Sequence, residues 1–335
     1  MKRLRLHQSG HVSLVAVVIV VVVVAGGAGF YVWKHQPKQV QANNASNSTG
    51  VTTPSAQAPS AKQPTDSINL AKLPLGDGKV SSTPKVGYVD SCTTNFRGGG
   101  ARHAGSWISG DTWDAESKPT VQGSVYWSSA KMSITLSGST RTISGNGLPI
   151  KLPTGIFPIQ SNTTAYQYDT NPNSIQSQQV FYQLSADPTL ASTPSCVPMG
   201  VIGYMTDGVA LFNALDDAGR DAAAHEIQDK CDGHPQMQGV YHYHSMSACV
   251  TAEDANNTLV GYALDGFGIF SDRDANGRQY TTADLDSCHG ITSPIMWNGK
   301  KVTMYHYVLT HDYPYTISCF RGTPVRTGAG SGPRP

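Results

Sequence analysis

Two segments of the chain repeat each other without a gap, and this repeat is the strongest constraint that the sequence places on the fold. GYMTDGVALFNALDDAGR from Gly203 and GYALDGFGIFSDRDANGR from Gly261 share the pattern G-Y-x-x-D-G-x-x-x-F-x-x-x-D-x-x-G-R. Each copy then reaches a cysteine, in DKC or DSC, and a Tyr-His-Tyr run. Because several elements recur in the same order, the sequence predicts a tandem duplication over about 203–249 and 261–319, and a pseudo-symmetric second half.

All cysteines fall between positions 92 and 319, and they are Cys92, Cys196, Cys231, Cys249, Cys288 and Cys319. An even number of cysteines in an oxidising compartment favours disulfides over a thiol catalyst or a Cys-rich zinc site. The repeat pairs Cys231 with Cys249 in the first copy. It pairs Cys288 with Cys319 in the second copy, which leaves Cys92 for Cys196. This connectivity rests on the repeat alone.

The N-terminus has the pattern of a membrane anchor. A basic stretch, MKRLR, lies in residues 1–11, and an almost wholly apolar run follows at 12–33. As a helix that rises about 1.5 Å per residue, this run can span a hydrocarbon core of roughly 30 Å. A signal peptide cleaved in AGGAG at 25–29 is the alternative, but the length of the run and the aromatic residues at its end favour an uncleaved anchor. We therefore expect a single-pass cell-membrane protein, with a cytoplasmic N-terminal tail, the membrane as a partner and an extracytoplasmic folded part.

Composition divides the rest of the chain into three parts. Residues 34–85 are rich in Pro, Ser, Thr, Ala, Asn and Gln, which predicts a disordered tether, and 323–335 predicts a flexible tail. One folded domain is expected at 86–322. The net charge of +1 and the lack of basic clusters beyond the N-terminus argue against nucleic acid as a partner. A cell-surface or envelope partner stays open.

The folded part is expected to be mainly β. The stretches 124–129, 131–138 and 140–145 alternate polar with apolar or β-branched residues, which is typical of short strands. One helix is predicted at 220–230, with Asp216 or Asp217 as its N-terminal cap. The predicted class is therefore β-rich α+β with short helices, internally duplicated in its second half and stabilised by disulfides.

Several motifs in order resemble one known family. These are GIFPI at 155, AYQYDTNPNSI at 165, GVALFNALDDAGRDAAAHEIQD at 208, YHYH at 241, GYALDGFGIF at 261 and YPYTISCFRG at 313. Together they resemble the YHYH domain family of secreted or membrane-attached proteins. The resemblance covers the whole expected domain, but it implies no established activity.

The histidines of YHYH are candidate metal ligands. In a strand, His242 and His244 share one face, and the tyrosines take the other. His306 aligns with His242 and supplies a third imidazole, which predicts a zinc or copper site with an open position. His234 and His289, just after the aligned cysteines, are secondary candidates. The alternative is a structural or adhesive surface domain whose histidines are hydrogen-bonded core residues and bind no metal.

Two acidic patterns need separate interpretation. Asp207 and Asp265 stand in the repeated Asp-Gly, which favours a type I′ turn, but each could instead orient a ligand histidine. The loop 272–284 has part of an EF-hand pattern, but Ala283 stands where the bidentate Glu belongs. A tight turn is favoured there, and calcium is not expected.

His225 and Glu226 are the weak candidates for catalysis. HEIQD resembles part of the H-E-x-x-H zinc-protease helix, with Asp229 in place of the second histidine. Glu226 would be the general base of a metal-dependent hydrolase if a metal were held by His242 and His244. An ordinary capped surface helix is the alternative, and whether the protein is an enzyme stays open.

Overall fold

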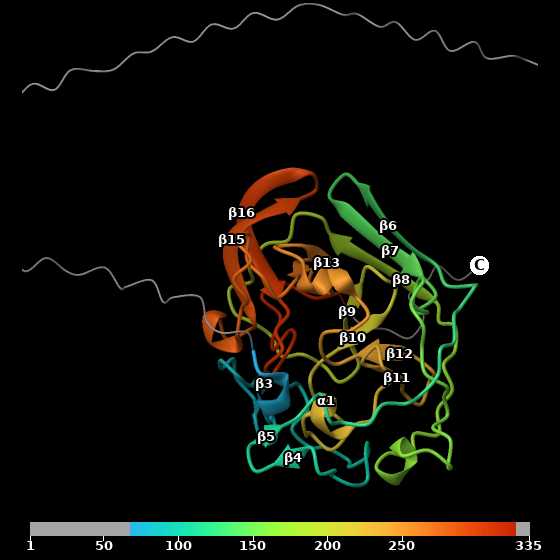
Figure 1. The fold of residues 1–335 in the computed structure, drawn as a ribbon. Coiled ribbons are helices and arrows are strands. Elements are labelled where there is room, and N and C mark those ends of the chain that lie inside the picture. Colours follow the sequence, from blue (N-terminus) through green and yellow to red (C-terminus); the bar gives the residue numbers. More distant parts are fainter. Residues whose placement is uncertain (1–67, 326–335) are drawn as a thin grey trace, which may run out of the picture. The chain divides into compact units, whose positions relative to one another are not determined.

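The structure is a computed structural model that describes residues 68–325 (Figure 1). Within this range the chain is mostly β, with a single short α-helix, α1 (Ala222–His225), and a few 3-10 turns. The prediction of a β-rich class with short helices and disulfides is confirmed. Residues 1–67 and 326–335, which include the expected cytoplasmic tail and the apolar run at 12–33, lie outside the described residues.

The centre of the domain is an eight-stranded sheet with the order β11-β12-β10-β9-β13-β14-β16-β15 (Figure 1). Its strands are β9 (Val201–Met205), β10 (Ala210–Phe212), β11 (Gly233–Pro235), β12 (Tyr241–Tyr243), β13 (Leu259–Ala263), β14 (Gly268–Phe270), β15 (Gly290–Trp297) and β16 (Lys300–Val308). β11 and β15 form its two edges.

Strand order and pairing are the same on the two sides of the sheet centre. β9 and β13 run antiparallel with Tyr204 opposite Tyr262. Moving outward on either side, β10 pairs in parallel with β12 and β14 pairs in parallel with β16, and an antiparallel strand closes each edge. The two segments of the sequence repeat therefore take equivalent places. A duplication as the origin of this arrangement stays a prediction.

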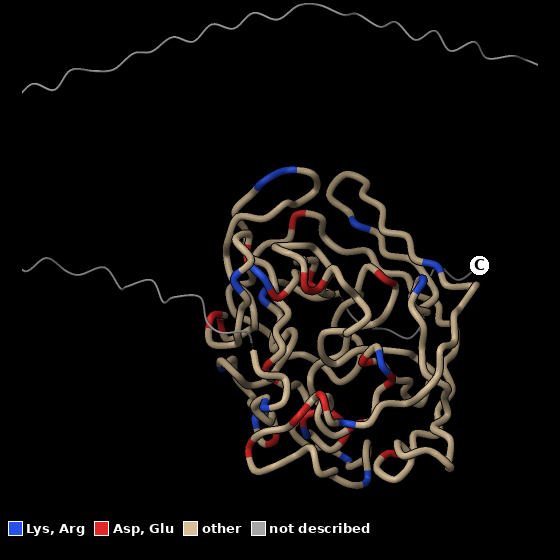
Figure 2. Tube along the Cα trace, in the orientation of Figure 1, with Lys and Arg blue, Asp and Glu red and all other residues tan. Residues whose placement is uncertain are grey.

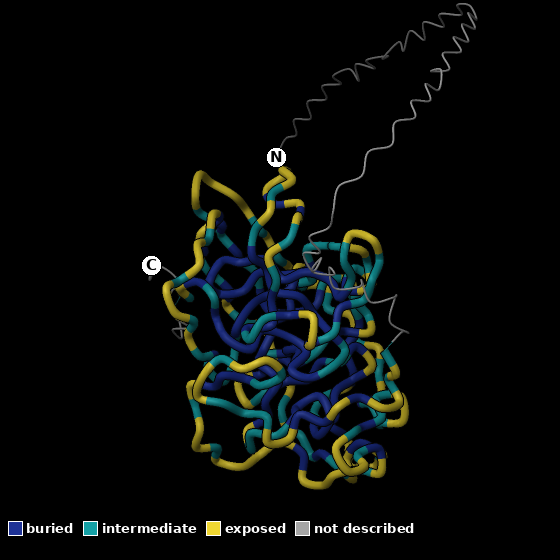
Figure 3. The backbone as a smooth tube through the Cα atoms, turned by 90° about the vertical axis from the view of Figure 1, so that its left-hand side faces the viewer, coloured by how far each residue is buried: buried dark blue, intermediate teal, exposed yellow. Residues whose placement is uncertain are grey.

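Apolar cores cover both faces of the central sheet. One core contains the four tyrosines of β12 and β16 and packs against N-terminal residues such as Leu73, Trp107 and Trp113. The other core lies between the sheet and the strands β6 (Met132–Ser137), β7 (Thr140–Gly145) and β8 (Val180–Ser185). Figure 3 shows the buried segments running through the middle of the domain and the exposed ones at its loops.

Short strands complete the N-terminal part. They are β1 (Leu73–Pro74), β2 (Val80–Ser81), β3 (Val89–Asp90), β4 (Ile108–Ser109) and β5 (Thr112–Trp113). β1 pairs with β5, β5 pairs with β4, and β2 pairs with β3. Leu73 and Leu75 are buried in the core although they lie in the predicted tether. The predicted boundary at residue 86 is thus corrected, because residues from 68 onward belong to the fold.

Buried tyrosine–aspartate hydrogen bonds hold β12 and β16 to the rest of the domain. Tyr241 and Tyr243 donate to Asp229 and Asp207. In the other half, Tyr305 and Tyr307 donate to Asp286 and Asp265. Because side chains alternate along a strand, these bonds fix the histidines of the same strands on the opposite face.

Three disulfides cross-link the chain, and they have the connectivity that the repeat predicts. Cys92 bonds to Cys196, Cys231 bonds to Cys249, and Cys288 bonds to Cys319. Such bonds persist in oxidising compartments, which agrees with a secreted or extracytoplasmic domain.

Three local predictions are wrong. The predicted helix 220–230 is only one turn long, and Asp221, whose side chain accepts from Ala224 N, caps it instead of Asp216 or Asp217. Residues 124–129 form no strand, since only Val125 makes an isolated bridge. The Asp-Gly turns are not type I′, because in each only the glycine, Gly208 or Gly266, has positive φ.

The expectation of the membrane as a partner through an N-terminal helix is corrected. Among residues 68–325 no helix is both long enough and apolar enough to cross a membrane.

The chain path in Figure 2 shows Lys and Arg interleaved with Asp and Glu across the described part of the domain.

Candidate metal centre

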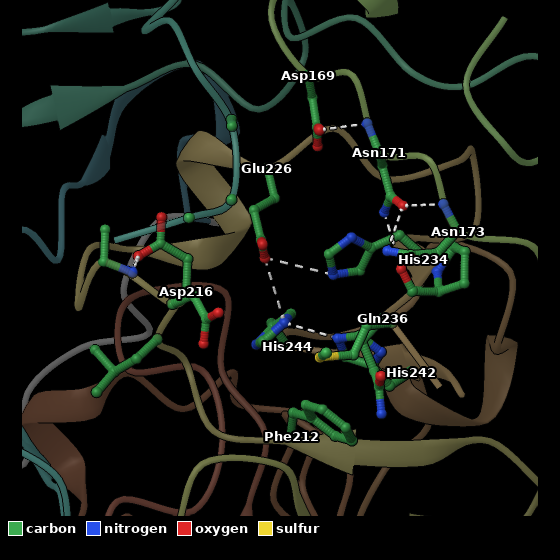
Figure 4. Close-up of a pocket in the computed structure, with 18 of the residues that line it drawn as sticks. Asp169, Asn171, Asn173, Phe212, Asp216, Glu226, His234, Gln236, His242 and His244 are labelled. Atoms are coloured by element: carbon green, nitrogen blue, oxygen red, sulfur yellow. Dashed lines mark hydrogen bonds and ion pairs between the residues drawn. The ribbon is translucent and has the colours of Figure 1, made fainter. Parts of the chain in front are cut away.

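Three imidazoles meet at the β11–β12 edge of the central sheet (Figure 4). His234 on β11 lies opposite His242 on β12 in the antiparallel register, so the two side chains share one face. His244 follows β12 two residues after His242 and points to that same face. The local pairing of one short hairpin therefore brings all three together.

The ring nitrogens are spaced as ligands of a single ion would be. His242 Nε2 lies 3.0 Å from His244 Nε2. One nitrogen from each of His234, His242 and His244 lies within 4.8 Å of the other two. Two ligands about 2.0–2.1 Å from a tetrahedral zinc ion are about 3.3 Å apart. His242 and His244 are already about this close, so a movement of the His234 ring toward them would complete such a site.

Backbone carbonyls set the tautomers of two of the histidines. His242 Nδ1 lies 3.0 Å from Val240 O, and His244 Nδ1 lies 2.5 Å from Asn213 O. If each Nδ1–H donates to its carbonyl, both Nε2 atoms carry lone pairs and face each other. Neither nitrogen of His234 has a hydrogen-bond partner, although the side chain is buried. The cluster thus offers several lone pairs, and no hydrogen bond holds the His234 ring.

Glu226 lies against the same cluster. Its Oε2 is 3.4 Å from His234 Nε2 and 3.4 Å from His244 Nε2, and it accepts no hydrogen bond. The residue is only 9% exposed. A carboxylate in this place can bind a cation directly or accept a proton from a water molecule bound to one.

Helix α1 and its contacts hold Glu226 in place. Asp221 caps the helix and also accepts from Gly76 N and the Tyr315 hydroxyl. At the other end, Trp107 Nε1 donates to Ala224 O over 2.8 Å, and Lys118 Nζ contacts Ala223 O. Glu226 directly follows this anchored turn, so its backbone is fixed relative to the hairpin that carries the histidines.

Burial keeps the three imidazoles neutral at neutral pH. It lowers the pKa of His234 and His242 well below the usual value, and lowers the pKa of His244 to about 4. The neighbouring imidazoles lower the pKa of His234 and His242 further. Burial also raises the pKa of Glu226 well above its usual value. Neutral imidazole is the form that binds a metal.

The cluster lines a pocket of about 870 Å³. Its walls come from the glycine-rich loop 99–102, the segment 169–173 and the turn 236–238 (Figure 4). Gly100 has φ +71°, and a Cβ there would lie 3.2 Å from Glu226 Oε1. Phe212 stacks on His242 with ring centres 3.8 Å apart. The site therefore opens into a space large enough for a small molecule or part of a polymer.

The structure places one predicted ligand away from the cluster. His306 does not join the cluster, because β16 lies in the other half of the sheet, where its Nδ1 lies 3.1 Å from Met304 O and Phe270 packs against it. His234, a secondary candidate, takes the third place. His289 is also excluded, since its Nε2 contacts Thr310 Oγ1 at 3.0 Å.

The pairing explains why His289 was misplaced. Gly233 pairs with Tyr243 and Gly290 pairs with Tyr307, so His289 takes the place of Asp232 and not that of His234. Asp232 and His289 both have positive φ, 61° and 70° respectively. At the position equivalent to His234, the second half has Ile291.

Two further roles are corrected. Asp207 and Asp265 accept from the hydroxyls of Tyr243 and Tyr307, on the tyrosine face, and orient no histidine of the cluster. His225 Nε2 lies 2.9 Å from Asp77 Oδ2, away from the cluster, although its neighbour Glu226 is part of it.

Sequence reasoning missed the pocket walls and Phe212. The repeat contains a signal for Phe212, because Phe270 takes the equivalent place beside His306. The segment 169–173 belongs to a motif that the sequence singles out, but its place beside the histidines depends on long-range contacts. One of these is the bond from Asn171 Nδ2 to Pro235 O.

Comparison with known families gives one match. Residues 181–281 match the family model described as YHYH protein, and this segment contains Glu226 and the three clustered histidines. Comparison with curated proteins gives no match, and neither does comparison with solved structures. The family that the motifs resemble is thus confirmed, and the chain carries a YHYH domain.

Proposed function

We propose that the YHYH domain binds one zinc or copper ion through His234, His242 and His244. The observation that supports this most strongly is the convergence of three buried imidazoles, one of which, His234, has no hydrogen-bond partner. Imidazole nitrogen suits both metals. In the alternative, a structural or adhesive domain without metal, these histidines would only pack.

The packing alternative explains the cluster less well. Two Nε2 lone pairs 3.0 Å apart repel each other unless a proton or a cation lies between them. His234, buried with both nitrogens unpaired, would cost free energy in a closed core. An ion bound to all three removes both costs. By contrast, His306 is an example of a packed histidine, with a backbone carbonyl and an aromatic ring as its neighbours.

Metal content of the full chain, expressed with its disulfides intact, tests the proposal. By mass spectrometry, we expect the wild type to hold about one equivalent of zinc or copper more than His242→Ala/His244→Ala, at matched folding by circular dichroism. His306→Ala is the matched control, since it removes a histidine from the same Tyr-His-Tyr context, and it should keep the ion. Wild-type protein that holds neither zinc nor copper, after incubation with both ions and gel filtration, would contradict the proposal.

The position of Glu226 favours a second candidate function, a metal-dependent hydrolase. If Glu226 does not bind the ion directly, three imidazole ligands would leave a tetrahedral ion one position for water. A water molecule there would be acidified by the ion. Glu226, 3.4 Å from two of the ligand nitrogens, is close enough to take its proton.

Glu226→Gln separates binding from catalysis. The variant should keep the metal, because the three imidazoles are unchanged. It should hydrolyse p-nitrophenyl acetate or fluorogenic casein roughly 10²- to 10⁴-fold more slowly than the wild type, since the general base is lost. Activity equal in the two proteins would rule out Glu226 as the base, and loss of the metal from the variant would make Glu226 a ligand.

A further inference from the structure

A second group of possible metal ligands lies away from the histidine centre. It consists of Asp254, Asp272 and His311, and one ligand atom of each lies within 4.8 Å of the other two. His311 Nε2 is 3.6 Å from Asp272 Oδ2. Asp254 ends the 3-10 turn Thr251–Asp254, Asp272 follows β14, and His311 follows β16. Three segments that are distant in sequence thus contribute one side chain each.

Asp272 is a buried carboxylate without a firm cationic partner. Its side chain is fully buried, and its Oδ2 accepts from the neutral amide of Gln279 over 2.6 Å. Its Oδ1 has no hydrogen bond. Arg273 Nε is 3.6 Å from this oxygen, which is too far for a hydrogen bond, and Arg273 Nη1 reaches toward Gly277 O instead. A buried charge in such surroundings needs a closer counter-charge.

Backbone hydrogen bonds prearrange the three segments. Asp272 N donates to Glu253 O over 3.1 Å, which places Asp254 beside Asp272. Leu309 N donates to Phe270 O over 2.9 Å and continues the parallel pairing of β14 with β16. His311 and Asp272 each lie two residues beyond this bond, so they emerge side by side.

We propose that Asp254, Asp272 and His311 form a second divalent metal site, of the zinc class, that clamps these segments together. Two carboxylates with one imidazole are a donor set that zinc accepts, and the nitrogen ligand favours it over calcium or magnesium. A bound ion would lie closer to the Asp272 carboxylate than Arg273 does and would supply a stronger counter-charge. It is independent of the histidine centre and does not need that centre to be correct.

Zinc titration of the full chain with disulfides intact tests the clamp, with a competing chromogenic chelator as the readout. In the His242→Ala/His244→Ala background, we expect one equivalent of zinc to remain. Adding His311→Ala or Asp272→Asn should weaken that binding at least tenfold. His103→Ala is the control, because it removes an exposed histidine that belongs to neither group.

The outcomes for the two sites can be told apart. Wild-type protein that binds zinc only in a His311-dependent way would support the clamp and contradict the histidine centre. A background variant that binds no zinc, or one whose affinity is unchanged by His311→Ala, would overturn the clamp. His311 is partly exposed, so its variant should fold even if Asp272→Asn does not, and folding is checked by circular dichroism.

Discussion

Tyrosine and histidine alternate in β12, and the two kinds of side chain contact different parts of the domain. Tyr241 and Tyr243 are fully buried, and their hydroxyls donate to aspartates of other segments. His242 and His244 face the pocket. The tyrosines thus contribute to stability, and we assign the histidines to the ion.

Tyr243→Phe should lower stability without weakening metal binding. The change removes the side-chain donor that Asp207 has among residues 68–325 and leaves a half-buried carboxylate less well solvated, at a cost of about 1–3 kcal/mol in the free energy of unfolding. Urea unfolding measures this cost, and Tyr307→Phe, in the equivalent place, should behave alike. A loss of metal as large as that of His242→Ala would contradict the separation of roles.

Asp221 should make the domain less stable as the pH rises from about 4 to 7. Burial raises its pKa to about 6, so the folded state holds the proton more tightly than the unfolded state. The resulting contribution is complete below the unfolded pKa near 4 and is lost as the pH passes 6, with a size of about 3 kcal/mol.

Asp221→Asn isolates this contribution, because Asn does not titrate and keeps one acceptor oxygen that can cap the helix; the bonds lost from Asp221 Oδ2 add a cost that does not depend on pH. Unfolding free energies of the metal-free proteins from pH 4 to 7 should fall more steeply for the wild type than for the variant. Parallel curves would show that Asp221 does not titrate in this range.

At the scale of elements, the hairpin of β11 and β12 determines the candidate site. Sequence alternation predicted that His242 and His244 share a face, because this depends only on the two-residue period of a strand. It did not predict His234 as the third histidine. That depends on the register between β11 and β12, and the sequence carries no marker for it.

The choice of His306 failed for a related reason. The repeat aligned it correctly with His242, but alignment does not say whether equivalent strands face each other or lie apart. Here four strands separate β12 from β16 in the sheet. The disulfides were predictable because each of the two repeated pairs closes within its own copy.

Removing the Cys231–Cys249 disulfide should weaken metal binding. This bond closes an interval of 18 residues that contains all three clustered histidines, and its loss should also cost about 3 kcal/mol of stability. The Cys288–Cys319 bond closes an interval of 31 residues in the other half and should cost a similar amount.

Comparing Cys231→Ser/Cys249→Ser with Cys288→Ser/Cys319→Ser separates the two effects. Both should unfold at lower urea concentration, but only the first should lose affinity for zinc by tenfold or more. Equal zinc affinities in the two variants would show that the hairpin keeps its geometry without the bond.

At the scale of the whole molecule, the domain is larger than the segment that matches the family. The match ends at residue 281, before β15 and β16, which supply one edge of the central sheet. The pocket also needs the wall at 99–102, and Cys196 needs Cys92. Sequence composition located the domain broadly but assigned its first residues to the tether, because few apolar residues mark them.

A fragment of residues 181–281 should therefore not fold. Without β16, Ile269 and Phe270 lose one of their two partner strands, and the apolar core loses residues from both sides. We expect no cooperative urea transition by circular dichroism, whereas residues 68–325 should show one. A cooperative transition in the short fragment would mean that half of the sheet is stable by itself.

The four side chains of the histidine centre lie between Glu226 and His244, and the bond that encloses the histidines ends at Cys249. The pocket walls at 99–102 and 169–173 come earlier still. All of these groups precede β13 in the chain, and none of the residues that line the pocket comes from the second half of the sheet. The second half therefore supports the candidate site only through the sheet, and substitutions there should change metal binding only by destabilising the fold.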